Sequence, residues 1–183
     1  MPAGRRRWAV VAIGLVLTTA VPAIAGHMAN WSHRHNNYPP KPNGLSQIKN
    51  VFGSPCSDRA RASSFRWMAA DNGVSYSVVY HRKLGGTTSS NLDHDVRGHI
   101  AKQHLNPYVK SGIWGYNCRF ISGTSKYSAH AWGIAVDVSS AYEPNGQCHS
   151  TTNWRHAPIW RDHRWTWGNA WCDPMHFQYA SGY

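Results

Sequence analysis

Acidic residues are scarce in this sequence: 8 Asp and Glu stand against 19 Lys and Arg, and the formal net charge is +11. Dense basic runs are lacking too, because the Lys and Arg residues are scattered along the chain. Nucleic-acid sites draw on clustered basic residues, so we expect no nucleic-acid partner. Internal repeats are absent as well, which leaves one domain with a tail for 183 residues.

Long apolar runs are also missing, since the longest, residues 8–20, falls short of the roughly 20 residues that a membrane span needs. It follows the basic residues 5–7 and precedes Ala-Ile-Ala at 23–25, a small-x-small cleavage pattern. We therefore expect residues 1–25 to be a secretory signal peptide. A membrane anchor is the alternative, and the arginine pair leaves the export route open.

Cysteine is limited to Cys56, Cys118, Cys148 and Cys172, and none is paired closely enough for a cysteine zinc knuckle. In an exported chain an even number of cysteines predicts disulfides, because the compartment is oxidising. Three connectivities are open. The order along the chain favours Cys56–Cys118 with Cys148–Cys172, as a guess.

The remaining chain divides into a leader and a folded part. Residues 26–46 are polar and rich in proline, which predicts a flexible leader, and residues 47–183 form the folded domain. Periodicity and turn residues predict an α+β fold with a small antiparallel sheet flanked by helices. The expected helices are 57–70, 92–105 and 158–163; the expected strands or extended segments are 74–80, 112–121, 134–138 and 175–179.

Two short motifs hold residues suited to a metal site. Residues 128–137 read SAHAWGIAVD and contain His130 and Asp137, and a second run holds Asp173 and His176. Two histidines and one aspartate make the three protein ligands of a catalytic zinc site, whose fourth position stays open for water or substrate. The remaining carboxylate, Asp173, is then free to act as a base.

The spacing of the motifs permits one site without requiring it. His130 and Asp137 are an odd number of positions apart, so on one straight strand they would point to opposite faces. Gly133 offers a bend between them, and Pro174 favours a kink before His176. Taken singly, a histidine before a glycine is more often structural, and Asp137 fits a turn cap equally well.

Together, the two motifs resemble the signature of the VanY-type zinc D-alanyl-D-alanine carboxypeptidases. That family is related to D-Ala-D-Ala dipeptidases and to L-alanyl-D-glutamate endolysins. The resemblance covers about residues 50–179 and implies a hedgehog/DD-peptidase-like fold whose sheet carries the zinc site. It implies Zn²⁺ as cofactor, bound by His130, Asp137 and His176.

The resemblance also implies roles for three further residues. Asp173 matches the general base, and Arg119 matches an arginine that contacts the substrate and polarises its scissile carbonyl. Ser128 matches a serine that lines the substrate pocket. One departure concerns Gln178, which stands where the family commonly has Glu. Another is that the base is Asp, as in some branches, and not Glu as in the dipeptidases.

We therefore expect a secreted bacterial zinc metallopeptidase of the cell wall, acting as a monomer on peptidoglycan peptides as a D,D-carboxypeptidase. An L-alanyl-D-glutamate endopeptidase and a non-catalytic zinc-containing wall-binding module are the alternatives. The basic surface suits anionic cell-wall polymers, although an ordinary solvated surface explains the charge as well.

Overall fold

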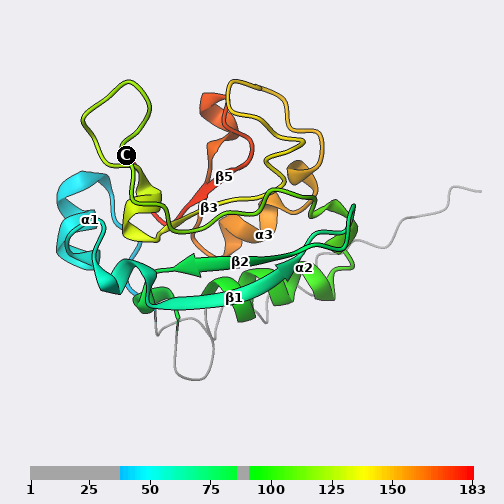
Figure 1. The fold of residues 1–183 in the computed structure, drawn as a ribbon, viewed down its shortest axis with the longest axis horizontal. Coiled ribbons are helices and arrows are strands. Elements are labelled where there is room, and N and C mark those ends of the chain that lie inside the picture. Colours follow the sequence, from blue (N-terminus) through cyan, green and yellow to red (C-terminus); the bar gives the residue numbers. More distant parts are fainter. Residues whose placement is uncertain (1–37, 86–90) are drawn as a thin grey trace, which may run out of the picture. The chain divides into compact units, whose positions relative to one another are not determined.

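The computed structural model describes residues 38–85 and 91–183 (Figure 1), so the expected signal peptide lies outside the described residues. Folded structure includes residues that we expected in the leader. Tyr38 is buried, and helix α1 spans Gly44–Phe52. The amide of Gly44 donates to the carbonyl of Ser181 at 2.7 Å, which ties this segment to the last residues of the chain.

The first sheet is an antiparallel hairpin of β1 (Ser63–Met68) and β2 (Ser75–Tyr80). The strand expected at 74–80 is confirmed, but the helix expected over 57–70 is wrong. That range holds a 3₁₀ turn, η2 (Asp58–Arg61), followed by β1. Phe65 and Trp67 are buried while their neighbours are exposed, a period of two that belongs to a strand.

Helices and short helical turns make up much of the chain after β2. A π-helical stretch, η4 (Asn91–Arg97), continues into α2 (Gly98–Lys102), which confirms the helix expected over 92–105. Helix α3 (Ala157–Asp162) confirms the one expected at 158–163. The other short helical turns are η3 (Arg82–Leu84), η5 (Asn106–Tyr108), η6 (Ala129–Trp132), η7 (Asn153–Arg155) and η8 (Gly168–Trp171).

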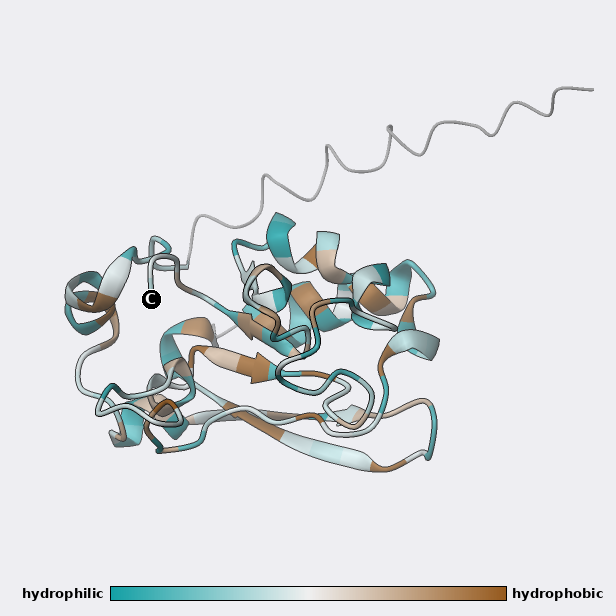
Figure 2. Ribbon diagram, turned by 90° about the horizontal axis from the view of Figure 1, so that it is seen from above, coloured by the Kyte–Doolittle hydropathy of each residue, from teal (hydrophilic) through white to brown (hydrophobic). Residues whose placement is uncertain are grey.

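The second sheet has three antiparallel strands in the order β3-β5-β4, and it confirms the α+β fold class. They are β3 (Ala135–Asp137), β5 (His176–Gln178) and β4 (Thr166–Trp167). Strands β3 and β5 are buried throughout. Figure 2, which colours the ribbon by hydropathy, shows hydrophobic and hydrophilic residues mixed along the chain. On the free edge of β3, Trp114 pairs with Asp137 through an isolated bridge.

A stack of aromatic rings joins the two sheets. Phe177 of β5 lies between Trp160, stacked at 4.3 Å between ring centroids, and Trp167 at 6.0 Å. Trp160 in turn stacks on Trp67 of β1 at 6.1 Å. Aromatic pairs in such arrangements stabilise a core beyond simple area burial. This stack therefore holds β5, and with it His176, against the hairpin.

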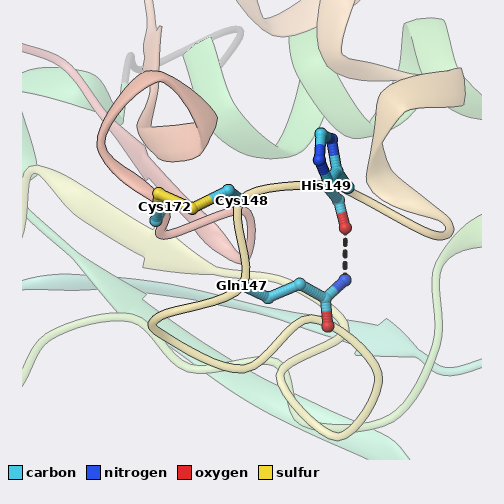
Figure 3. The surroundings of a disulfide bond; sticks show 4 residues. All are labelled: Gln147, Cys148, His149 and Cys172. Carbon is cyan, nitrogen blue, oxygen red and sulfur yellow. Dashed lines mark hydrogen bonds between the residues drawn. A yellow bond between two sulfur atoms is a disulfide. The ribbon is translucent and has the colours of Figure 1, made fainter.

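Both expected disulfides are confirmed, Cys56–Cys118 and Cys148–Cys172. The second joins the loop after β3 to the end of η8 (Figure 3), where the Gln147 side chain donates to the carbonyl of His149. In the part of the chain that the structure describes, no helix combines the length and apolar character that crossing a bilayer requires.

Candidate metal centre

His130 is held on a single helical turn. It belongs to η6, whose first residue follows the cap Ser128 and whose end is Gly133. Gly133 has φ = 64°, a left-handed conformation that glycine adopts without strain. A Cβ at this position would overlap the carbonyl oxygen of Ala60, so there is no room for a side chain larger than the hydrogen of glycine. The expected bend between the two ligands of the first motif is confirmed.

Asp137 and His176 face each other across the sheet. They are directly paired in the antiparallel register of β3 and β5. Directly opposed residues of an antiparallel pair place their side chains on the same face, with Cβ atoms about 5 Å apart. The bend at Gly133 adds His130 to this pair from outside the sheet.

Three candidate ligand atoms converge at this point. Oδ1 of Asp137 lies 3.1 Å from Nε2 of His130 and 3.1 Å from Nδ1 of His176, and the two nitrogens are 3.2 Å apart. Ligands at zinc–nitrogen and zinc–oxygen distances of about 2.0–2.1 Å with tetrahedral angles lie about 3.3 Å from one another. All three residues are buried. The donor set and its spacing fit a zinc ion with three protein ligands.

The outer ring nitrogen of each histidine also has a partner. Nδ1 of His130 lies 2.6 Å from the carbonyl oxygen of Gly115, to which it donates. Nε2 of His176 lies 3.0 Å from Oε1 of Gln178, and the Gln178 amide donates onward to the carbonyl of Tyr183. Such partners fix the tautomer and orientation of metal-binding histidines. Gln178 thus acts as hydrogen-bond acceptor where the family commonly has a glutamate.

The electrostatics of the cluster favour the charged carboxylate. Burial works to raise the pKa of Asp137, but His130 and His176 outweigh it and hold that pKa well below its usual range. Burial likewise works to lower the pKa of His176, yet its bond to Asp137 keeps it raised. A buried carboxylate that stays ionised is a competent ligand for a divalent cation.

Asp173 lies beside the cluster without joining it. Its amide donates to the carbonyl of Gly168 at 3.1 Å, and its carbonyl accepts from the amide of His176 at 3.1 Å. Oδ1 of Asp173 is buried and has no hydrogen-bond partner among the described residues. Burial raises the pKa of Asp173, and the charge of Asp137 adds to the rise. A carboxylate with an unused oxygen and a raised pKa is suited to accepting a proton.

A pocket of about 330 Å³ opens over these residues. Arg119, Ser128, Asp173 and His176 all line it, so the structure gathers four of the six expected site residues on its wall. The hydroxyl of Ser128 also caps η6, because it accepts a hydrogen bond from the amide of His130 at 3.4 Å. Its role toward substrate stays a prediction, as do the catalytic roles of Asp173 and Arg119.

The pocket also includes residues that the motifs did not indicate. Asn145 reaches it from the loop after β3, and Tyr183 from beyond β5. Trp171 lines it with 48% of its surface exposed, whereas Trp132 is buried. Asn145 lies in a turn sequence, which carries no chemical signal that could have identified it.

Comparison with known proteins agrees with this geometry. No curated protein and no solved structure is similar enough to the chain to match it. A family model described as D-alanyl-D-alanine carboxypeptidase matches residues 122–179. That segment contains His130, Asp137 and His176 together with Asp173. The resemblance is thus confirmed over residues 122–179, which are similar to the D-alanyl-D-alanine carboxypeptidase family.

Proposed function

We propose that this protein is an exported zinc peptidase that removes the terminal D-alanine from peptidoglycan stem peptides. The observation that carries the proposal is a buried His-Asp-His cluster whose His176 lines a pocket, with the separate carboxylate of Asp173 also on the pocket wall. The family match supports a metal-dependent peptidase acting on peptidoglycan. Two disulfides suit the oxidising compartment that an exported protein reaches.

The zinc ion would be held by His130, Asp137 and His176, and when bound it supplies a Lewis acid that activates water and polarises the scissile carbonyl. Asp173 accepts the proton that the attacking water gives up, because its Oδ1 is unpartnered. The same carboxyl then returns a proton to the amine of the departing D-alanine. Its raised pKa suits it to both transfers.

Arg119 also lines the pocket and supplies positive charge there. Its guanidinium donates only a long bond, 3.3 Å, to the carbonyl of Phe120, and the residue is exposed. It is the only Lys or Arg among the lining residues. Its charge partly offsets the rise in the pKa of Asp173 that burial causes. In this position it stabilises the negative charge that develops on the carbonyl oxygen during attack.

The function is tested on defined muropeptides with mass analysis of the products. We expect release of terminal D-alanine in the presence of zinc and none after chelation. Cleavage between L-alanine and D-glutamate would instead establish the endopeptidase. If neither cleavage product formed, the proposal of a peptidase acting on this substrate would be refuted.

Asp173→Asn tests the base separately. We expect turnover to fall by roughly 10²–10⁴-fold, because the proton acceptor is lost while the three ligands remain. Zinc content, measured by elemental analysis, should stay unchanged. Asp162→Asn, an exposed carboxylate at the end of α3, is the matched control and should retain full activity. Full turnover in Asp173→Asn would contradict the proposed role.

A further inference from the structure

Trp114 lies next to the metal centre on the surface. It exchanges both backbone hydrogen bonds with Asp137, at 2.9 and 2.8 Å, along the free edge of β3. Residues paired in this way place their side chains on the same face of a sheet. Trp114, Asp137 and His176 therefore form one row across three neighbouring backbone segments. Trp114 is the exposed end of that row, with 56% of its surface accessible.

The Trp114 ring is fixed in spite of its exposure. Its Nε1 donates to Oγ of Ser140 at 3.1 Å, and its edge-to-face contact with Tyr76 has a centroid distance of 5.5 Å. An exposed tryptophan that is held from two sides has already lost most of its rotational freedom. Binding to such a ring costs little further entropy, which is the physical basis of a preorganised recognition surface.

A second exposed ring lies close by in the loop after β3. Tyr142 is 44% exposed, and its hydroxyl donates to Oδ2 of Asp71 at 3.1 Å. Ser140, which accepts the Trp114 bond, is two positions before it and is itself tied to the carbonyl of Gly112 at 2.9 Å. We refer to Tyr76, Trp114 and Tyr142 as the aromatic platform.

The chemistry of the platform suits a sugar polymer better than an apolar partner. Its two exposed rings, Trp114 and Tyr142, are bordered by the Ser140 hydroxyl and the Asp71 carboxylate to which they donate, so polar groups interrupt the apolar surface that lipid or a protein helix would need. Sugar rings present C–H groups on their faces and hydroxyls at their edges. Flat aromatic faces bordered by hydrogen-bonding groups match both features.

We propose that the aromatic platform binds the saccharide strand to which the stem peptide is attached, with Trp114 as its principal contact. The platform is adjacent to the candidate metal centre, because Trp114 and the candidate ligand Asp137 are paired neighbours. The identity of the polymer rests on the proposed function. The platform would place a polymer-linked peptide over the site more effectively than a free peptide.

Binding of peptide-free glycan strands from peptidoglycan to the zinc-loaded protein tests this surface directly. We expect Trp114→Ala and Trp114→Leu to weaken binding by roughly tenfold, since both remove the ring and the second keeps apolar bulk. Trp114→Tyr should retain most of it. Trp154→Ala removes a tryptophan of similar exposure, 49%, that stacks with Arg155 instead, and it should bind as the unmodified protein does.

Absence of glycan binding, or equal binding by Trp114→Ala, would overturn the proposal. A loss that Trp154→Ala shares would do the same, because it would reflect surface aromaticity in general. Peptide hydrolysis plays no part in this measurement, so failure of the peptidase assignment would be seen separately. In a turnover assay, Trp114→Ala should raise KM for glycan-linked pentapeptide several-fold more than KM for free pentapeptide. Equal effects on both substrates would also overturn it.

Discussion

At the scale of single residues, His81 is a buried histidine held in its neutral form. It has no exposed surface; Nδ1 accepts from the amide of Lys83 at 3.0 Å, and Nε2 donates to the carbonyl of Phe52 at 3.1 Å. Burial lowers the pKa of His81 to about 4, and the nearby basic residues assist. Both ring nitrogens are in use, so protonation would break the bond from Lys83.

This arrangement predicts acid sensitivity. The unfolded chain protonates His81 below about pH 6.5, whereas the folded protein resists protonation until about pH 4. The unfolded state thus binds more protons in this window, and the free energy of unfolding falls as pH falls, by on the order of 3 kcal/mol from this residue. Urea unfolding at pH 7, 5 and 4 measures it. His81→Gln should flatten the profile, while the exposed His149→Gln should not. Parallel profiles for all three proteins would contradict the prediction.

Site residues could be predicted from the sequence where their side chains themselves carry the chemistry. His130, Asp137 and His176 could be named because few residue types bind zinc and their motifs are specific. The support of His130 by the Gly115 carbonyl could not be, because every residue offers a carbonyl and only the fold selects one. Tyr183 joined the pocket for a similar reason, since its position depends on how the chain turns after β5.

At the scale of elements, η8 holds the candidate base and one ligand in close contact. Gly168 begins this turn, and a Cβ there would overlap the carbonyl oxygen of Asp173 and lie 3.1 Å from the Cβ of His176. Only a residue without a side chain allows these two segments to approach so closely. Gly168 therefore sets the distance between the end of β4 and the site.

Replacing this glycine should damage the site more than the fold. In Gly168→Ala the added methyl must displace Asp173 or His176, and a shift of about 1 Å in a catalytic group can lower turnover by about 100-fold. We expect the loss of stability to stay within about 1–3 kcal/mol. Turnover and zinc affinity, measured with a competing chelator, report the first effect, and thermal unfolding reports the second.

Gly98→Ala provides the comparison. Gly98 lies in α2 with nothing within 4 Å of a Cβ at that position, so alanine should stabilise the protein by about 0.5–1 kcal/mol and leave turnover unchanged. Full activity in Gly168→Ala would show that the approach of the two segments has no functional importance.

The elements differ in how far their patterns predicted them. The segment 74–80 alternates over most of its length and is rich in β-branched and aromatic residues, so it was predicted as a strand. The segment 57–70 offers a cap and helix-forming alanines, and a glycine stop follows it at Gly73. Tertiary pairing overrides those local signals, because β1 buries Phe65 and Trp67 only when it pairs with β2. Sequence periodicity cannot show that preference while the partner strand is unknown.

At the scale of the whole molecule, the two disulfides should separate stability from activity. Cys56–Cys118 closes a separation of 62 residues and Cys148–Cys172 one of 24. Chain entropy alone gives contributions of about 4 and about 3 kcal/mol. Removing the first pair by serine substitution should therefore destabilise the protein more.

Turnover should follow the opposite order. Cys172 directly precedes Asp173, and its carbonyl accepts from the amide of Gly146 at 2.7 Å, close to Asn145 in the pocket wall. Loss of Cys148–Cys172 frees both sides of that wall at once. Thermal unfolding and muropeptide turnover of the two double serine variants measure the two orders. If the variant that lost more stability also lost more turnover, neither disulfide would act on the site specifically.

The disulfide pairing was a guess from the order of the cysteines, and the structure confirms it. The α+β class followed from patterns that extend along the chain. The start of the folded part did not, because residues 38–46 are polar and gain their order from contacts with the far end of the sequence. The bond between Ser181 and Pro42 at 2.9 Å is an example. Such pairing across the whole chain leaves no local trace in composition.

The register between β3 and β5 also orders events in time. A slip of one residue would turn Asp137 to the other face of the sheet and separate it from His176. The two ligands are 39 positions apart, so a nascent chain has no site until synthesis has passed residue 176 and the last strand has paired correctly. Metal binding at this site would therefore be a late event in the life of each molecule, because an unfinished or misregistered chain lacks the complete candidate site.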